Sequence, residues 1–211
     1  MSQSKPFIEQ MTLGMLGTNC YILADEETGQ ALIVDPAAEP EQIVQRCREL
    51  EVTPAAVLLT HGHYDHLGAA DTLCRTWQIR LYAGAAEKEL LGSPDANLSA
   101  DFYMPVSLQA DELLEDGTVL ELAGRTLQVI ATPGHTKGGV CYYDEAGGFL
   151  FSGDTLFRQS VGRSDLPTGN MLELIRSIRE KLMILPDDTV VYPGHGPSTS
   201  IAFERKNNPF I

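Results

Sequence analysis

The stretch Thr60-His61-Gly62-His63-Tyr64-Asp65-His66 places three of the chain's five histidines within one heptapeptide. Imidazole is the commonest metal ligand in proteins, and histidines that serve only packing do not gather this closely. His61 and His63 are two residues apart on an expected loop, so both side chains can point the same way. Asp65 and His66 open an expected helix and can reach a second position. The heptapeptide therefore predicts a metal centre with nitrogen and oxygen ligands.

The other two histidines stand in similar settings, which are Thr132-Pro133-Gly134-His135-Thr136 and Tyr192-Pro193-Gly194-His195-Gly196. A carboxylate, Asp154, follows Ser152-Gly153 in the same manner. Each motif comes directly after an apolar run typical of a β-strand, and a strand end is a rigid platform for a ligand. We therefore expect the motifs to meet at one edge of a sheet.

Together these motifs supply seven candidate metal ligands. They are His61, His63, Asp65, His66, His135, Asp154 and His195. Seven ligands can hold two divalent ions, with Asp154 bridging them, and still leave an open position for a reacting water. Asp65 and Asp154 are the candidate catalytic residues, because Asp65 can also orient the nucleophile. Zn²⁺ is the expected ion, with iron and manganese as alternatives, because no thiolate is among the ligands.

Length and composition limit the remaining possibilities. The chain has 211 residues, 43% of them hydrophobic, and a net charge of −14, so we expect one globular domain over residues 1–211. The negative charge argues against a nucleic-acid partner or an anionic membrane surface. Residues 1–6 lack a signal-peptide apolar core, and no apolar run is long enough to span a membrane. Four separated cysteines fit reduced thiols in a cytoplasmic protein; they are Cys20, Cys47, Cys74 and Cys141.

Hydrophobic patterning predicts alternating strands and helices. Strands are expected at residues 19–24, 31–35, 56–60, 79–83, 119–122, 126–131, 140–144, 149–152 and 189–192. Helices are expected at 41–50, 65–77, 170–185 and 199–206, the third with Asn170 as its N-cap. Residues 87–115 are broken by glycine and proline and predict an irregular excursion. Two groups of strands with helices between them favour two packed sheets covered by helices.

The motifs His-x-His-x-Asp-His, Pro-Gly-His-Thr, Ser-Gly-Asp-Thr-Leu-Phe and Pro-Gly-His-Gly resemble those of the metallo-β-lactamase fold superfamily, and most closely its glyoxalase II-like branch. The resemblance implies an αββα sandwich, in which two mixed sheets are flanked by helices and the metals lie at one sheet edge. It also implies the ligand sets: His61, His63 and His135 on one ion; Asp65, His66 and His195 on the other; Asp154 bridging.

The same resemblance implies an enzyme that hydrolyses small acyl thioesters such as S-lactoylglutathione through a metal-bridging hydroxide. Glyoxalase II enzymes continue beyond the metal site into a helical segment that contacts glutathione. Here only residues 196–211 follow His195. We therefore expect a small-molecule acyl thioester as the substrate, with weak recognition of the glutathione tail.

Three residues are candidates for substrate contact. The stretch Gly162-Arg163-Ser164-Asp165 resembles a loop of glyoxalase II-like and persulfide dioxygenase proteins. Arg163 can bind a substrate carboxylate through two hydrogen bonds, or it can form a structural pair with Asp165. Phe102 and Tyr103 are expected at the pocket mouth, or alternatively in the core.

Other functions also fit the motifs. One is a mononuclear iron persulfide dioxygenase, which the Gly162–Asp165 loop keeps open. Another is hydrolysis of a lactone or a phosphodiester, although the net charge of −14 disfavours RNA as a substrate. A metal-binding module without catalysis is the last, and seven intact ligands argue against it. The sequence leaves the oligomeric state unassigned.

Overall fold

The computed structural model describes residues 6–211, and it contains two six-stranded sheets. In order across the first sheet lie β1 (Phe7–Leu13), β2 (Thr18–Asp25), β3 (Gln30–Val34), β4 (Thr53–Leu58), β5 (Arg80–Gly84) and β6 (Glu112–Leu114). The second has β14 (Thr199–Ser200), β13 (Val190–Pro193), β10 (Phe149–Gly153), β9 (Val140–Asp144), β8 (Arg125–Ala131) and β7 (Val119–Leu122). Residues 1–5 lie outside the described residues, and with them most of the segment 1–6 in which the sequence analysis found no signal-peptide apolar core.

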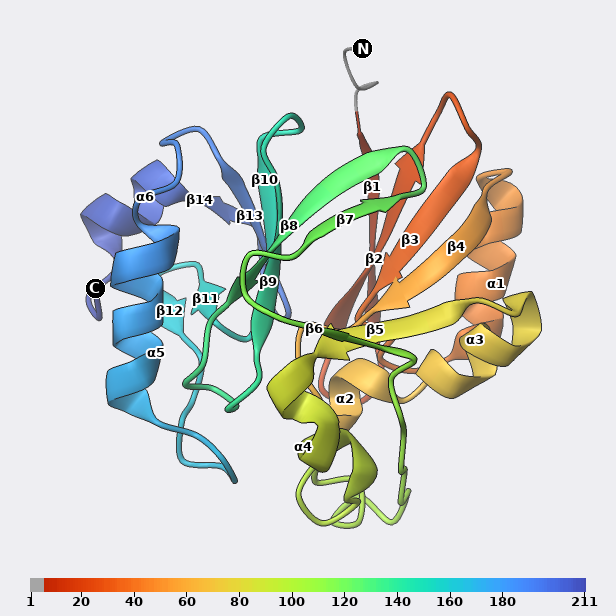
Figure 1. Ribbon diagram of the computed structural model, residues 1–211, viewed down its shortest axis with the longest axis horizontal. Helices are drawn as coiled ribbons and strands as arrows, with labels where there is room; N and C mark the ends of the chain where they lie inside the picture. Colours follow the sequence, from red (N-terminus) through yellow and green to blue (C-terminus); the bar gives the residue numbers. More distant parts are fainter. Residues whose placement is uncertain (1–5) are drawn as a thin grey trace.

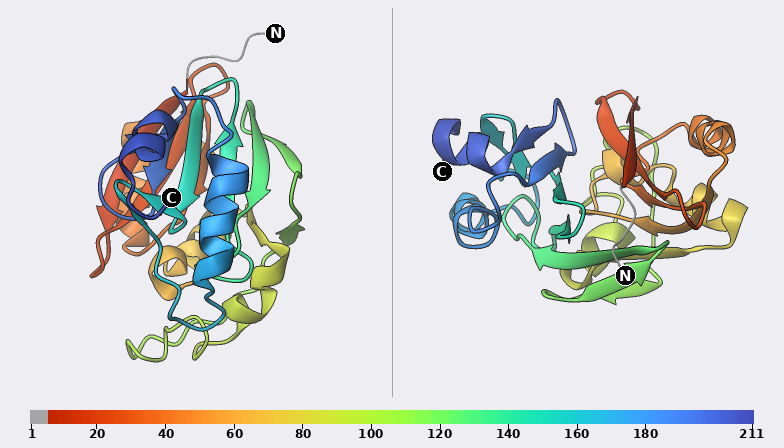
Figure 2. Two further views of the ribbon diagram at one scale, coloured as in Figure 1. Left: turned by 90° about the vertical axis from the view of Figure 1, so that its left-hand side faces the viewer. Right: turned by 90° about the horizontal axis from the view of Figure 1, so that it is seen from above.

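Helices cover the outer face of each sheet (Figures 1 and 2). Beside the first sheet lie α1 (Pro40–Glu49) and α3 (Ala70–Trp77), and beside the second lie α5 (Met171–Ser177) and α6 (Ile201–Asn207). Both sheets mix parallel and antiparallel pairs. In the first sheet β3, β4, β5 and β6 run parallel, while neighbours among β1, β2 and β3 are antiparallel. In the second sheet β10 is parallel to β13 and antiparallel to β9. The expected αββα sandwich of mixed sheets is confirmed.

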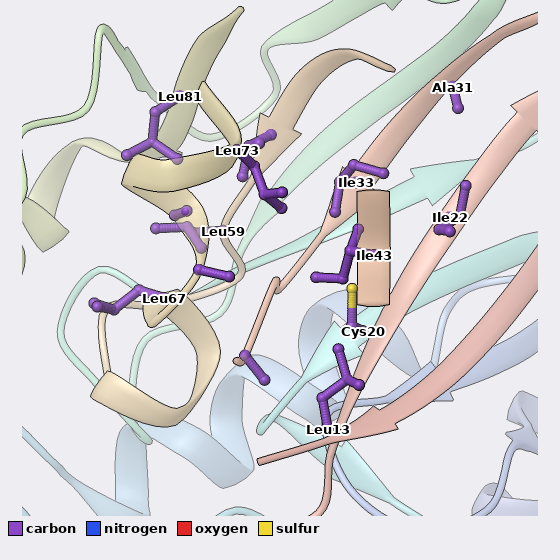
Figure 3. Close-up of a cluster of buried hydrophobic side chains, with 14 of the residues drawn as sticks. Leu13, Cys20, Ile22, Ala31, Ile33, Ile43, Leu59, Leu67, Leu73 and Leu81 are labelled. Atoms are coloured by element: carbon purple, nitrogen blue, oxygen red, sulfur yellow. The ribbon is translucent and has the colours of Figure 1, made fainter. Parts of the chain in front are cut away.

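Strand alternation explains why the sandwich has three apolar layers. Along β2, Cys20 and Ile22 face the helices α1 and α3, whereas Tyr21 and Leu23 face the second sheet. Figure 3 shows the layer between the first sheet and its helices. In β10, Leu150 packs toward α5 while its neighbours face inward. Because both faces are covered, the central residues of these strands are apolar.

The strand directions bring the motifs to one edge of the sandwich. In the second sheet, β8 and β10 are each antiparallel to β9, and β13 is parallel to β10. The carboxyl ends of β8, β10 and β13 therefore lie at the same edge, where they lead into His135, Asp154 and His195. From the first sheet, β4 leads into the histidine-rich heptapeptide and α2 (Tyr64–Leu67).

Two of the expected helices differ from the structure. Residues 65–77 form α2 and α3 rather than one helix, because the Ala69 amide donates to the Pro36 carbonyl instead of continuing the α2 ladder. Gly68 at this break lies so close to the Ala37 carbonyl that a Cβ would be only 2.3 Å away. The helix expected at 170–185 begins with the predicted Asn170 cap but changes after Ser177 to a π-type turn over Ile178–Leu182.

Smaller elements complete the fold. The excursion at 87–115 begins at the end of η1 (Ala85–Glu87) and contains α4 (Lys88–Gly92) and β6. A ribbon of β11 (Leu156–Phe157) and β12 (Ser160–Val161) follows β10. The expected final helix begins at Ile201, after the short strand β14. Among the described residues, no helix is long and apolar enough to cross a membrane.

Candidate metal centre

The seven predicted ligands lie together at the shared edge of the sheets. They form three overlapping groups within which the donor atoms lie no more than 4.8 Å apart. The groups are His61, His63 and His135; His61, His66 and Asp154; and Asp65, His66 and His195. The two outer groups consist of the same residues as the two ligand sets expected from the sequence. The middle group shares His61 with one and His66 with the other, and it adds Asp154.

The first group converges through ring nitrogens. The Nε2 atoms of His61 and His135 are 3.2 Å apart, and His63 Nδ1 lies 3.0 Å from His135 Nε2. The other nitrogen of His135 donates to the Arg163 carbonyl at 2.7 Å. The Thr60 hydroxyl donates its proton to Asp35, so its oxygen can only accept from His61 Nδ1, at 3.2 Å. Each Nε2 atom of this pair therefore presents a lone pair.

A cation fits between these lone pairs. Burial and the neighbouring imidazoles lower the pKa of His61 well below its ordinary value, and burial lowers the pKa of His63 to about 3. Burial also lowers the pKa of His135. Neutral imidazoles place acceptor against acceptor, an arrangement that a bound metal ion stabilises. In addition, His63 Nε2, His66 Nε2 and Asp154 Oδ1 are buried without a hydrogen-bond partner.

The second group combines carboxylates with imidazoles. His66 Nε2 lies 3.4 Å from Asp154 Oδ1 and 3.5 Å from Asp65 Oδ2, and His195 Nε2 lies 3.2 Å from Asp65 Oδ2. Burial opposes a charge on His66, but Asp65 and Asp154 raise its pKa well above the ordinary value. Burial also opposes a charge on Asp65, yet His66 and His195 lower its pKa. A metal ion here would displace the proton of His66.

Asp35 is a buried carboxylate behind the ligands that the sequence analysis did not identify. It accepts a hydrogen bond from His66 Nδ1 at 3.0 Å, from the Thr60 amide at 2.8 Å and from the Thr60 hydroxyl at 2.6 Å. These contacts orient His66 directly and His61 through Thr60, as outer partners of metal sites commonly do. Its place directly after the apolar strand β3 was the available signal.

Glu87 is a second missed residue, and it is 1% exposed. Its Oε2 accepts from the Gly62 amide at 2.8 Å, while Oε1 accepts from the Gly138 amide at 2.8 Å and the Thr136 hydroxyl at 2.6 Å. Burial raises its pKa, although these hydrogen bonds oppose the increase. Glu87 thus ties the backbone between His61 and His63 to the loop after His135, and no local motif marks it.

The start of β2 positions the turn that carries His195. The Asn19 amide donates to the Gly194 carbonyl at 2.7 Å, and its side chain donates to the Pro193 and Gly196 carbonyls at 3.0 and 2.8 Å. At Gly194, a Cβ would lie 2.2 Å from Asp154 Oδ1. A side chain at that position would displace the carboxylate, so glycine allows the turn to approach the centre.

The candidate substrate contacts lie farther from the ligands. Arg163 pairs with Asp165 through two contacts of 2.7 Å, and both side chains are mostly exposed. Its backbone carbonyl is the part that contacts His135. Phe102 stacks on Tyr64 with ring centroids 4.1 Å apart, and Tyr103 is 94% exposed. Substrate binding by these three residues stays a prediction.

The cysteines do not take part in the ligand groups found in the described part of the chain. All four are free thiols, and burial raises the pKa of each, to about 11 for Cys47 and Cys141 and about 12 for Cys74. Protonated, shielded thiols are poor metal ligands and poor nucleophiles.

Proteins of known sequence are similar to this chain over almost its whole length. It is 39% identical to the "Probable metallo-hydrolase YqgX" of Bacillus subtilis, over 96% of both proteins. It is 34% identical to the "Hydroxyacylglutathione hydrolase GloC" of Haemophilus influenzae, over 97% of both.

Solved structures show the same fold. The BLEG-1 B3 metallo-beta-lactamase matches with a TM-score of 0.92 and 39% identity, covering 97% of this chain and 99% of that one. TTHA1623 in a di-iron-bound form matches with a TM-score of 0.86 and 37% identity, covering 96% of this chain and 100% of that one. ETHE1 from Myxococcus xanthus matches with a TM-score of 0.81 and 31% identity, covering 96% of this chain and 83% of that one. The model of the metallo-beta-lactamase superfamily matches residues 13–195, and the chain belongs to that superfamily.

Proposed function

We propose that this metallo-hydrolase of the metallo-beta-lactamase superfamily hydrolyses small acyl thioesters at a centre for two divalent ions. The observation that carries the proposal is the pair of facing lone pairs on His61 and His135, 3.2 Å apart, next to the carboxylates Asp65 and Asp154. Such a donor set suits two cations that share a ligand. The similarity to a hydroxyacylglutathione hydrolase over 97% of both chains supports a thioester as the substrate class.

In this proposal His61, His63 and His135 would hold one ion, and Asp65, His66 and His195 would hold the other, with Asp154 beside both groups. When bound, such ions would supply activation of a water and electrostatic stabilisation of a carbonyl oxygen. Zn²⁺ is the expected metal, while the di-iron form of TTHA1623 makes iron the first alternative to measure.

The chain's own groups supply positioning. Thr18 donates to Asp65 Oδ2 at 2.9 Å, and His195 contacts the same oxygen. One oxygen of Asp65 is thereby held in place, and the carboxylate can orient the attacking water. Asp154 is 13% exposed and His195 29% in their side chains, so a substrate can approach the centre from this side. A thiolate leaves without a proton donor more readily than an alkoxide or amide, because thiols have a pKa near 8.5.

A persulfide dioxygenase is the second candidate. His61, His66 and Asp154 form a group of two histidines and one carboxylate, the ligand type of mononuclear iron oxygenases. The chain is also 31% identical to ETHE1 from Myxococcus xanthus. This alternative differs from thioester hydrolysis in requiring oxygen.

A substrate panel separates these functions. Protein loaded separately with zinc, iron or manganese is given S-lactoylglutathione, a simple acetyl thioester, a β-lactam, a lactone and a phosphodiester, and product release is followed. Oxygen uptake is measured with glutathione persulfide. We expect thioester hydrolysis with kcat/KM above about 10⁴ M⁻¹ s⁻¹, within the usual range for enzymes. Oxygen uptake without thioester hydrolysis would contradict the proposal.

A further inference from the structure

A cavity of about 390 Å³ lies directly beside the metal centre. Its wall includes Asp65, one of the candidate ligands, and Thr18, which donates to the Asp65 carboxylate at 2.9 Å. The cavity lies between the turn that joins β1 to β2, the start of α1 and the segment after Tyr103. A substrate whose reacting group lies at the metals would therefore have one arm within reach of this space.

The wall of the cavity is largely apolar. Met15, Leu16 and Met104 line it and are 76%, 50% and 62% exposed, and Val106 and Pro40 add further hydrocarbon surface. Large apolar side chains that remain exposed around one concave surface commonly mark a site that binds an apolar partner. Here they surround an opening that leads to catalytic groups.

The charges around the cavity disfavour an anionic occupant. Among the residues that the structure describes, the charged ones that line it are Glu39 and Asp65, and no lysine or arginine of that part of the chain contributes to its wall. Glu39 already accepts from the Gly14 amide at 2.9 Å, which joins the β1–β2 turn to the start of α1. The carboxylates of glutathione or the phosphates of coenzyme A would find no lysine or arginine partner in this wall and would meet the carboxylate of Glu39, which is not a metal ligand.

We propose that this cavity is the subsite for an aliphatic acyl chain, so that the enzyme favours thioesters of hydrocarbon acids over short or hydroxylated ones. The inference rests on the proposed thioester hydrolysis. The thiol arms of common thioesters are polar or charged, whereas the acyl arm can be hydrocarbon throughout. Each methylene that enters the cavity adds up to about fourfold in binding.

Tyr64 gives the cavity a firm wall on the side of the metal centre. Its ring stacks on Phe102 at an interplanar angle of 24°, and it directly precedes the ligand Asp65. Phe102 does not line the cavity itself but packs against Tyr64, which does. Tyr64 thereby supplies an aromatic surface to the cavity wall next to the candidate ligand Asp65.

The test uses the metal-loaded protein and acetyl, butanoyl and hexanoyl esters of one neutral thiol, N-acetylcysteamine. We expect kcat/KM for hexanoyl to exceed that for acetyl by at least about tenfold. Met15→Glu and Met104→Glu should each reduce this ratio at least about fivefold, because a carboxylate in the wall opposes an alkyl chain. Leu172→Glu is the matched control, since Leu172 is 83% exposed on α5 and does not line the cavity.

If the unchanged protein has a hexanoyl-to-acetyl ratio of kcat/KM near one, the proposal is overturned. It is also overturned if neither Met15→Glu nor Met104→Glu reduces that ratio. If no thioester is hydrolysed by metal-loaded protein, the proposed function fails by itself. Binding of ketone analogues, with a methylene in place of the sulfur, then decides about the cavity. Affinity that rises with chain length and falls in Met104→Glu supports an acyl subsite, and affinity independent of length overturns it.

Discussion

The metal-ligand cluster and the apolar cavity are neighbours, but they are built in opposite ways. His61 and His66 are 2% and 0% exposed, and their Nδ1 atoms contact Thr60 and Asp35. In the cavity, Met15 and Met104 are mostly exposed, and their packing leaves 390 Å³ of open space. The cluster is held by specific hydrogen bonds, while most of the cavity wall is apolar surface.

This difference separates chemistry from selectivity. Ligands must be held to within a fraction of an ångström, which requires locked side chains and outer partners. An apolar subsite needs only volume and hydrocarbon, so it tolerates change. Substitutions in the cluster should therefore affect all substrates alike, while substitutions in the cavity should change the relative rates of different substrates.

The largest effect is expected from Asp154→Ala. Asp154 lies between the two ligand groups, 3.4 Å from His66 and 3.7 Å from His135, so its loss weakens both. We expect loss of most bound metal and a fall in kcat of more than about 100-fold, beyond the effect typical of outer partners. Elemental analysis and thioester assays check this. Full metal content in the variant would contradict the bridging assignment.

Asp35→Asn should have the next largest effect. The amide keeps the shape of the side chain but cannot accept from His66 and Thr60 with both of its ends. We expect metal affinity to fall about 10- to 100-fold, measured by competition with a chromophoric chelator on folded protein. Asp116→Asn is a control on a mostly exposed carboxylate that pairs with Lys181. Equal affinities in the two variants would show that Asp35 has no role in orienting ligands.

Glu87→Gln tests the frame behind the first ligand group. The carboxylate accepts three hydrogen bonds from Gly62, Gly138 and Thr136, and a glutamine turns its NH₂ toward at least one donor. We expect a loss of about 1–3 kcal/mol in the free energy of unfolding and a smaller loss of metal affinity than in Asp35→Asn. Chemical denaturation and the same chelator competition measure the two quantities. Unchanged stability would show that these contacts are not required.

Arg163→Ala should have the smallest effect. Its side chain forms an exposed pair with Asp165, and such pairs contribute little to stability because water and salt screen them. The carbonyl that contacts His135 remains in the variant. We expect a change of less than about threefold in kcat/KM for neutral thioesters. A rise in KM restricted to acidic thioesters would restore Arg163 as a binding residue for substrate carboxylates.

The same contrast explains what could be predicted from the sequence. His61, His63 and Asp65 lie in one local pattern, and His135, Asp154 and His195 each follow an apolar strand. Strands that are buried on both faces read as apolar runs, so most of the sandwich could also be predicted. Both kinds of feature can be recognised from residues that are close together in the sequence.

Features that depend on contacts distant in the sequence could not be predicted. Asp35 and Glu87 reach Thr60 and Gly62 from other strands and loops, and neither has a motif of its own. The break at Gly68 follows from the Pro36 carbonyl, and β1 is an edge strand with a mixed polar pattern. The cavity arises only where Met15 and Met104 are brought together, 89 positions apart in the numbering (104 minus 15).

The most direct test of the dinuclear centre is the metal content of the unchanged protein. Protein prepared with zinc, iron or manganese is dialysed and analysed by elemental analysis alongside its concentration. The two outer ligand groups, with Asp154 3.4 Å from His66 and 3.7 Å from His135, predict a plateau of about two ions per chain, as in other two-metal sites. A plateau at one ion per chain with every metal would contradict the account and favour the mononuclear dioxygenase.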